Sequence, residues 1–458
     1  MLQRSRWPGH AAPAVLAALC SVAGAAAAAP QGAVPLAAVP YAPDSGSLAI
    51  RCGVLIDGIA AEPRPDVTVV IEQGRIVSVA EGTAPGSATV PTLDLSQHTC
   101  LPGLIDMHTH LTDRPGDTAD LSVYYRRTAG DQARIALENA RTTLLAGFTT
   151  TRDVGTYLGW ADRALRDEID RGRAVGPRLQ VAGYYLTIPG GGGDLVIPGH
   201  PESDIPAQVR LGVARGPEEF RRKAELAVAG GADFLKLIAS GAVLAYGGVP
   251  GEPEMTPEEI AAVVQVAHAH GLKVAAHAHG ARSIREAILA GADTIEHASL
   301  IDDEAIALAR QHDVALSMDV YNGDYIDTEG RRQGWPEEFL RKNLETTEAQ
   351  RLGFAKAHAA GVPIVYGTDA AVYPHGVNAR QFTIMVQRGM TPMQAIQSAT
   401  SVAAKYLGWS GRVGALAPGR YGDLVAVPCN PLADIACLQS VDVVVKGGLL
   451  FKRPGTDR

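Results

Sequence analysis

The strongest chemical signal in the sequence is a pair of histidines, His108 and His110, separated by one residue. They follow a short apolar run beginning at Leu104, which is typical of a buried β-strand. Alternate residues of a strand point to the same side, so both imidazoles are expected to face one point. Two imidazoles on one face can bind one metal ion, and the alternative is a pair of unrelated surface histidines.

A lysine inside an apolar run is the second signal. Lys236 lies in the segment Phe234-Leu235-Lys236-Leu237-Ile238, where an unpaired ammonium is costly to bury. A modified or metal-associated lysine removes that cost. The alternative is a lysine whose aliphatic stem is buried and whose ammonium reaches solvent.

Further side chains that could bind a metal follow later in the chain. His277 and His279 repeat the spacing of the first pair, and His297 ends another apolar run. One of the first two could be only a core or substrate-pocket histidine. Asp369 could both bind a metal and exchange a proton with a reacting group. Its alternative role, the N-cap of a helix at Ala370, is disfavoured because no long helical pattern follows.

These candidates are expected at the ends of parallel strands. From Leu104 onward, eight short apolar runs alternate with segments of helical periodicity, which predicts an α/β fold, a (β/α)₈ TIM barrel. Active sites of such barrels form at the carboxyl ends of the strands. The long connections 186–216 and 319–345 are expected to be functional loops. The predicted strands are 103–108, 148–153, 178–182, 234–238, 273–277, 294–296, 315–318 and 363–366.

The two flanks of this region have a different texture, with short apolar runs separated by Gly, Pro and Asp turns. Such runs indicate antiparallel strands, and we expect the N- and C-terminal segments to form one small β-sandwich. The expected domains are a signal peptide at 1–29, a linker at 30–47, the two parts of the sandwich at 48–104 and 411–458, and the barrel at 105–410.

The N-terminus predicts export. Arg4 and Arg6 precede a long uncharged stretch rich in alanine, which is typical of a cleaved secretory signal peptide rather than a stable membrane anchor. We therefore expect a periplasmic or secreted protein. In such a compartment Cys429 and Cys437 could pair, although free thiols remain the alternative and no connectivity follows from the sequence.

The charge balance narrows the partners. The 458 residues carry a formal net charge of -8 without a run of like charges, which disfavours binding to nucleic acid or to an anionic membrane. The composition, with 46% hydrophobic residues, is that of a globular protein. We expect a small-molecule substrate.

These motifs resemble those of the metal-dependent amidohydrolase superfamily, in its imidazolonepropionase-like and prolidase-like branch. The resemblance covers nearly the whole chain after the N-terminal segment. The matching segments are 101–110, 147–155, 232–243, 274–280, 294–299, 367–370 and 414–427.

The resemblance implies a site with two metal ions. His108 and His110 would bind the first metal together with Asp369, and His277 and His297 would bind the second. Lys236 would be carboxylated by CO₂, and its carbamate would bridge both ions. Zinc suits this mixture of nitrogen and oxygen ligands, with manganese or cobalt as substitutes.

The resemblance also implies the reaction. Two divalent ions supply a bridging hydroxide near neutral pH and polarise the scissile carbonyl, while Asp369 carries the proton to the leaving amine. The third loop has glycines at 190–193 where relatives often carry a histidine. His200 or His279 could take its place, and Tyr246 could hydrogen-bond a substrate carboxylate, with solvated loop residues as the alternative for each.

We therefore predict a hydrolase that cleaves the amide bond of N-acyl amino acids or dipeptides. The sequence is similar to exported bacterial amidohydrolases of this kind, some of which convert ochratoxin A into phenylalanine and ochratoxin alpha. Two alternatives are a cyclic-amide or lactone hydrolase on the same fold and a metal-free scaffold. Barrels of this superfamily often assemble, so a homo-oligomer is expected.

Overall fold

The computed structural model describes residues 41–84 and 87–455. The predicted signal peptide at 1–29 and most of the predicted linker at 30–47 lie outside the described residues. Among the described residues, no helix has the length and apolar character that crossing a bilayer requires. The domain boundaries inferred from the sequence stay a prediction.

Parallel strands form the centre of the fold, as the sequence predicted. Hydrogen-bonded parallel neighbours join β5 to β6 and β7, and β8 to β9, β10, β11, β12 and β13. These strands are β5 (Leu104–Thr109), β6 (Phe148–Asp153), β7 (Arg178–Val181), β8 (Tyr185–Leu186), β9 (Phe234–Ile238), β10 (Lys273–Gly280), β11 (Thr294–Leu300), β12 (Ala315–Ser317) and β13 (Ile364–Val365).

Backbone hydrogen bonds close these strands into a barrel. The nitrogen of Met107 donates to the carbonyl of Tyr366 at 2.8 Å, and the nitrogen of Asp369 donates to the carbonyl of His108 at 2.7 Å. The third barrel strand is split, because β7 pairs with β6 while the short β8 pairs with β9. The backbone hydrogen bonds of Met107 and Asp369 hold the segment after β13 beside β5. This brings Asp369 next to His108 and His110.

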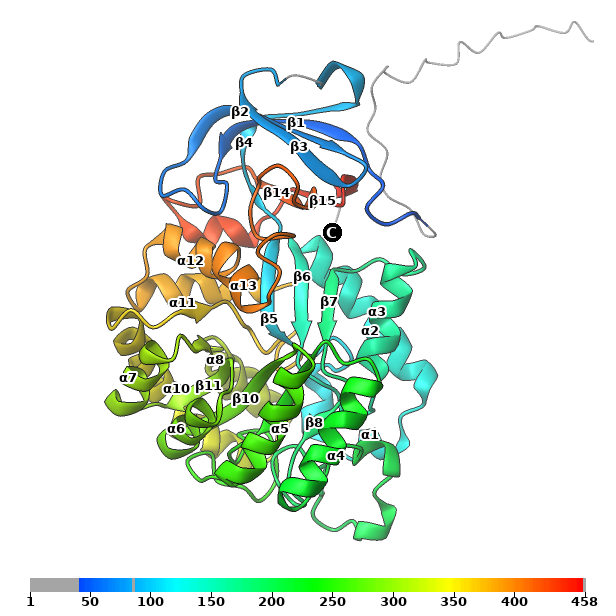
Figure 1. Cartoon of the computed structure of the whole chain (residues 1–458), viewed down its shortest axis with the longest axis vertical. Helices are drawn as coiled ribbons and strands as arrows, with labels where there is room; N and C mark the ends of the chain where they lie inside the picture. The colour runs from blue at the N-terminus through cyan, green and yellow to red at the C-terminus, as the bar shows by residue number, and fades with distance from the viewer. Residues whose placement is uncertain (1–40, 85–86, 456–458) are drawn as a thin grey trace, which may run out of the picture. The chain divides into compact units, whose positions relative to one another are not determined.

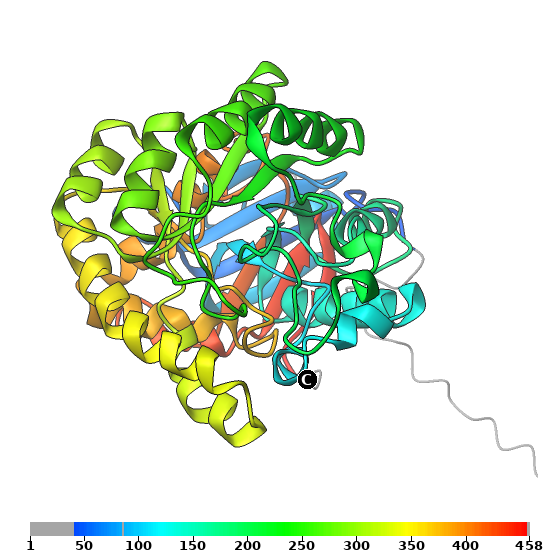
Figure 2. The ribbon, with the colours of Figure 1, turned by 90° about the horizontal axis from the view of Figure 1, so that it is seen from below.

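Helices cover the outside of the barrel, as Figure 2 shows. The helix α5 (Pro257–Ala269) begins as its sequence predicts, because Thr256 and Glu259 form a capping box. The other principal helices are α2 (Ala129–Leu145), α3 (Ala161–Asp170), α4 (Gly216–Ala229), α6 (Ala281–Ala290), α7 (Asp303–Gln311), α10 (Glu337–Ala359), α11 (Gln381–Gln387), α12 (Pro392–Ser398) and α13 (Ser401–Tyr406).

The N- and C-terminal segments pair in one seven-stranded sheet of the described residues, with the order β16-β15-β14-β4-β1-β2-β3. Its strands are β1 (Leu48–Leu55), β2 (Arg64–Glu72), β3 (Arg75–Glu81), β4 (Thr92–Pro102), β14 (Leu424–Val427), β15 (Val443–Lys446) and β16 (Leu449–Lys452). The pairing of the two flanks is therefore as expected, while the two-layered sandwich stays a prediction.

Strand β4 leads directly into the barrel strand β5, as Figure 1 shows. Gly103 lies between them, and a Cβ at this position would lie 2.0 Å from Oγ1 of Thr149. The absence of a side chain at Gly103 therefore lets the junction of β4 and β5 lie close against Thr149 of β6. The terminal sheet thus continues into the strand that carries the first histidines.

An arginine on the barrel strand β7 forms hydrogen bonds with both the N-terminal and the C-terminal segment. Arg178 donates hydrogen bonds to Asp423 and to Asp44, with shortest distances of 2.8 Å and 2.5 Å. The ring of Tyr421 stacks between Arg75 and Arg178, each with its guanidinium carbon 3.6 Å from the ring centroid. The C-terminal Tyr421-Gly422-Asp423 turn therefore has a structural role.

Two disulfides lie in the outer segments. Cys429 pairs with Cys437, as the sequence allowed, and Cys52 pairs with Cys100. The second pair joins β1 to the parallel neighbour β4. Spacing could not reveal it, because 48 residues separate the two cysteines.

The long connections predicted at 186–216 and 319–345 contain short helical turns. The first carries η3 (Glu202–Asp204) and η4 (Ala207–Val209). The second carries α8 (Asn322–Tyr325), the π-helix η5 (Ile326–Gly330) and α9 (Arg331–Gln333) before α10 begins.

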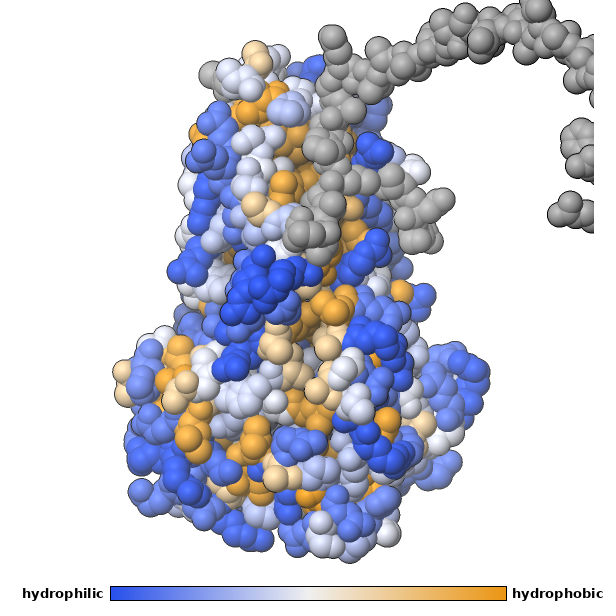
Figure 3. Space-filling view, turned by 90° about the vertical axis from the view of Figure 1, so that its right-hand side faces the viewer, coloured by the Kyte–Doolittle hydropathy of each residue, from blue (hydrophilic) through white to orange (hydrophobic). Residues whose placement is uncertain are grey.

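On the face shown in Figure 3, hydrophobic side chains are interspersed with hydrophilic ones. The strongly exposed large hydrophobic residues of the described chain are spread over several helices and loops, for example Ile59, Leu226, Leu289 and Leu344. The predicted homo-oligomer stays a prediction.

Candidate metal centre

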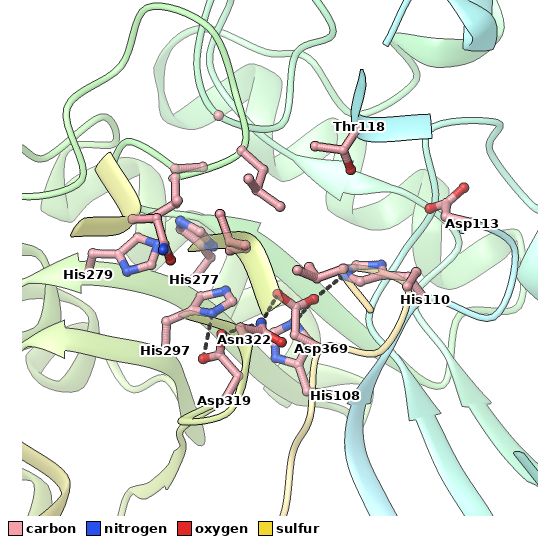
Figure 4. Close-up of a pocket in the computed structure, with 18 of the residues that line it drawn as sticks. His108, His110, Asp113, Thr118, His277, His279, His297, Asp319, Asn322 and Asp369 are labelled. Atoms are coloured by element: carbon pink, nitrogen blue, oxygen red, sulfur yellow. Dashed lines mark hydrogen bonds and ion pairs between the residues drawn. The ribbon is translucent and has the colours of Figure 1, made fainter. Parts of the chain in front are cut away.

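The six residues that the sequence nominated as metal ligands meet in one cavity of about 170 Å³. Four of them lie on barrel strands, His110 follows β5 and Asp369 follows β13, and parallel strands bring such distant residues together. Figure 4 shows the histidines and Asp369 facing one another across this cavity. The six are His108, His110, Lys236, His277, His297 and Asp369.

The first cluster joins the two histidines of β5 to the acid after β13. Nε2 of His110 lies 3.2 Å from Oδ1 of Asp369, and Nε2 of His108 lies 3.5 Å from the same oxygen. These three side chains form a group that could hold a metal ion. Two imidazole nitrogens and one carboxylate oxygen are a donor set that zinc accepts.

The second cluster consists of His277, His279 and His297. The ring centroids of His277 and His297 are 4.5 Å apart, and those of His279 and His297 are 4.8 Å apart. The sequence suggested His279 as a substrate-binding residue. In the structure it lies about as close to His297 as the predicted metal ligand His277 does. His297, Asp319 and Asp369 form a third group, which links the two clusters.

Hydrogen bonds orient the imidazole rings. Nδ1 of His108 lies 2.7 Å from Glu296, Nδ1 of His110 lies 2.8 Å from the carbonyl of Gly155, and Nδ1 of His297 lies 3.0 Å from Asp319. With the proton on Nδ1, Nε2 of His108 and of His297 keeps a free lone pair, whereas Nε2 of His110 contacts Asp369. Such outer partners commonly orient histidines that bind metals.

Lys236 lines the same cavity as the two clusters. It is 2% exposed, and its Nζ has no hydrogen-bond acceptor among the described residues. Burial lowers the pKa of this amine to about 8, against the opposing effect of Glu296. A buried amine without a hydrogen bond is costly, which makes this atom a candidate for binding a further group.

Asp369 is held in place by Asn322, whose Nδ2 donates to Oδ2 of Asp369 at 3.0 Å and to Oδ2 of Asp319 at 2.6 Å. Burial alone would raise the pKa of Asp369, but the charges of His108 and His110 and the hydrogen bond from His110 hold it below its usual range. The carboxylate is therefore ionised at neutral pH.

The backbone is strained at the same place. His297 has a φ of 69° and Asp369 a φ of 56°, in the left-handed region that residues with a Cβ rarely adopt. Strain of this kind costs about 1–3 kcal/mol and clusters at functional sites. Here it coincides with two of the proposed ligands.

Sequence reasoning missed Glu296, Asp319 and Asn322. Glu296 precedes His297 in the strand and is fully buried. An acidic residue inside an apolar run could have indicated this role from the sequence. Asp319 and Asn322 lie in a connection without a local pattern, so only the fold reveals them.

The remaining substrate-contact candidates lie elsewhere. Tyr246 packs on Phe339 with ring centroids 4.8 Å apart, and His200 contacts Tyr125. Neither is among the residues that line the cavity, whereas Tyr185 is. The contacts of Tyr246 and His200 with substrate therefore stay a prediction, because neither residue lines the cavity.

The glycine loop leaves little room for a side chain at Gly192 and Gly193. Gly192 and Gly193 line the cavity. A Cβ on Gly192 would lie 2.9 Å from Cβ of Ala242, and one on Gly193 would lie 2.9 Å from Cγ1 of Ile238. Close packing of this loop therefore accounts for the glycines.

A parallel barrel with histidines, a lysine and an acid at its carboxyl-terminal rim defines a metal-dependent hydrolase of the amidohydrolase type. Residues 99–450 match the model of the amidohydrolase family, and the chain belongs to this family. It is an enzyme that hydrolyses amide or peptide bonds.

Comparison with known proteins agrees. An ochratoxinase from Aspergillus niger is 31% identical over 430 residues, which cover 89% of this chain and 87% of the relative. The crystal structure of a Xaa-Pro dipeptidase with bound methionine superposes with a TM-score of 0.82 at 35% identity, covering 89% of this chain and 100% of the other. A prolidase complexed with N-methylphosphonate-L-proline has a TM-score of 0.81 at 28% identity, covering 89% and 100%.

Proposed function

We propose that the protein is a binuclear zinc hydrolase that cleaves the amide bond of N-acyl amino acids or dipeptides, with ochratoxin A among the substrates. The observation that carries the proposal is Lys236, a buried amine without a hydrogen bond among the described residues, in the cavity that both clusters of histidines and carboxylates line. Relatives named as an ochratoxinase and as a Xaa-Pro dipeptidase support the substrate class.

The residues fit a pair of metal ions. His108, His110 and Asp369 would hold the first ion, and His277 and His297 the second. His279, which lies in the same cluster, is available to the second ion or to the substrate. All these groups are nitrogen or oxygen donors that zinc accepts, with manganese and cobalt as substitutes.

Lys236 would complete both sites as a carbamate. Its lowered pKa, about 8, leaves part of the amine unprotonated near neutral pH. An unprotonated amine adds to CO₂, forming an N–C bond and releasing a proton. The resulting anionic oxygens would replace a cationic side chain where the two ligand clusters meet.

When bound, a pair of divalent ions lowers the pKa of a shared water and polarises the scissile carbonyl. Asp369 then acts as the general base and acid, because its ionised carboxylate can take the proton from the attacking water and deliver it to the leaving amine. Asn322 keeps Oδ2 of Asp369 in position for this transfer.

We also propose export of the protein. Cys52–Cys100 and Cys429–Cys437 support an oxidising compartment, in agreement with the signal peptide expected at 1–29.

Substitution of Lys236 tests the proposed metal centre. In Lys236→Ala, we expect bound zinc to fall from about two ions per chain to less than one and turnover of an N-acyl amino acid panel to be nearly abolished. Lys446→Ala is a matched control, because Lys446 is also buried with a pKa lowered to about 8 but does not line the cavity.

Zinc content by elemental analysis and initial rates should be measured on both variants. Unchanged zinc content and activity in Lys236→Ala would exclude the bridging lysine. Hydrolysis of cyclic ureides or lactones, with none of any N-acyl amino acid or dipeptide, would instead favour the cyclic-amide hydrolase.

A further inference from the structure

Asp113 is a buried acid that the proposed reaction does not use. It is 7% exposed, lines the cavity beside His110, and lies with Thr118 on the His110 side of the pocket in Figure 4, away from His279. Its carboxylate receives a hydrogen bond from Nε2 of Gln132 at 3.4 Å. No ion pair of Asp113 with a described lysine or arginine is found.

Three tyrosines surround the same space. Tyr124, Tyr157 and Tyr185 line the cavity, and their rings follow one another with centroids 4.9 Å and 5.2 Å apart. After burial, the charge of Asp113 is the leading cause that raises the pKa of each of the three phenols. Asp113 therefore acts on all three hydroxyls at short range.

The hydroxyls of two of these tyrosines already contact neighbouring groups. Tyr185 donates to the carbonyl of Gly155 at 3.1 Å, and its hydroxyl lies 3.2 Å from Nδ1 of His110. Tyr124 lies 3.4 Å from Asp117 and also hydrogen-bonds Asp113. The carboxylate and the three phenols therefore place several oxygen atoms at one corner of the cavity.

The neighbouring arginines pair with Asp117 rather than with Asp113. Arg127 forms a paired hydrogen bond with Asp117, and Nε of Arg114 lies 3.5 Å from the same carboxylate. His110 also faces Asp113, but its Nδ1 contacts Gly155 and its Nε2 belongs to the first ligand cluster. Asp113 therefore has no described arginine or lysine of its own, and His110 is the charged group that faces it.

We propose that Asp113, with Tyr124, Tyr157 and Tyr185, binds a primary ammonium group of the substrate. An ammonium presents three N–H donors and a positive charge, which match the carboxylate, the phenolic oxygens and the aromatic walls. The inference rests on the proposed amide hydrolysis and narrows its substrates to amines, such as dipeptides with a free α-amino group.

A pair of isosteric substrates tests the ammonium site. Glycyl-phenylalanine carries an ammonium where propionyl-phenylalanine carries a methyl group, and both have the same scissile amide. We expect wild type to favour glycyl-phenylalanine by about 10–100-fold in kcat/KM, chiefly through a lower KM. In Asp113→Asn the preference should shrink to within about 3-fold, because KM for the amine rises while kcat stays similar.

Two controls accompany this variant. Asp204→Asn removes an exposed carboxylate that does not line the cavity and should keep the wild-type preference. The zinc content of Asp113→Asn should equal that of wild type, which separates a lost substrate contact from a damaged metal centre.

A second pair identifies the source of the ammonium. Nα-acetyl-lysyl-phenylalanine and Nα-acetyl-norleucyl-phenylalanine differ in a side-chain ammonium. A preference confined to this pair and lost in Asp113→Asn assigns the site to a substrate side chain. Equal rates within both pairs, or a preference that persists in Asp113→Asn, overturn the ammonium site while leaving amide hydrolysis intact. Hydrolysis of none of the four amides overturns the proposed function together with the inference.

Discussion

Glu296 accepts a hydrogen bond from Nδ1 of His108 at 2.7 Å, although 188 residues separate the two in the sequence. The other carboxylate oxygen of Glu296 accepts a hydrogen bond from Arg152, also at 2.7 Å. The charges of Arg152 and His108 hold the pKa of Glu296 well below its usual range, although burial alone would raise it. An ionised carboxylate therefore fixes the ring of a proposed metal ligand.

We predict that Glu296→Gln weakens zinc binding by about 10–100-fold, because the neutral amide orients His108 less firmly. The variant should also lose about 3–5 kcal/mol of unfolding free energy, since Arg152 is left buried without its charge partner. Competition with a chelator and denaturant unfolding measure the two effects.

Glu259→Gln is a matched control for this variant. Glu259 is a buried glutamate at the start of α5, where it accepts hydrogen bonds from the backbone of Thr256 and Gly216. Its replacement should lower stability by about 1 kcal/mol and leave zinc affinity unchanged. Equal zinc affinity in Glu296→Gln and wild type would rule out the orienting role.

Asn322 is expected to govern the rate rather than the metal content. Asn322→Ala removes the donor that holds Asp369, so kcat should fall by about 10–100-fold, part of the 10²–10⁴ that general acid–base catalysis contributes. Zinc content should stay at the wild-type level, because Asn322 supplies no predicted ligand. Steady-state kinetics and elemental analysis of the same preparation provide the measurement.

The comparison for Asn322 is Asn343→Ala. Asn343 is another buried amide in the cavity lining, and its Nδ2 donates to the carbonyl of Gly323 rather than to a carboxylate. Its effect on kcat should be smaller. A larger loss in Asn343→Ala than in Asn322→Ala would contradict the role assigned to Asn322.

The two disulfides should stabilise the fold unequally. In the chain-entropy model, closing a loop of about 48 residues contributes about 4 kcal/mol and one of about 8 residues about 2.5 kcal/mol. Replacing Cys52 and Cys100 together by alanine should therefore cost more unfolding free energy than replacing Cys429 and Cys437. Guanidinium unfolding of both double variants measures the difference, and the reverse order would refute the prediction.

The contact between Asp44 and Arg178 should contribute stability that depends on pH. Burial alone would raise the pKa of Asp44, but the hydrogen bonds and charge of Arg178 hold it below its usual value of 3.8. A lowered acid pKa stabilises the folded protein fully above pH 3.8, and this contribution is lost as the pH falls through the folded pKa. Asp44→Asn should thus cost about 1 kcal/mol at pH 7, allowing for solvent screening.

The cost of Asp44→Asn should shrink as the pH approaches 2, as followed by denaturant unfolding at several pH values. Asp66→Asn serves as the control, because Asp66 forms an exposed pair with Arg51, and such pairs contribute little. A cost of Asp44→Asn that is constant from pH 7 to pH 2 would exclude the proposed linkage.

The sequence by itself was sufficient to predict the barrel strands and the residues at their ends. Hydrophobic runs and their spacing are local properties, and parallel strands must present their carboxyl ends on one side. For this reason His108, Lys236 and Asp369 could be assigned to one site from the sequence, although they lie far apart along the chain.

Only the tertiary structure decided which other side chains enter that space. Glu296, Asp319 and Asn322 act through partners from other strands, and Tyr246 turns to Phe339 instead of the cavity. Asp113 lies near Tyr157 and Tyr185, which come from other segments of the chain and line the same cavity. Side-chain contacts of this kind depend on how distant loops pack, and no periodicity in the chain encodes them.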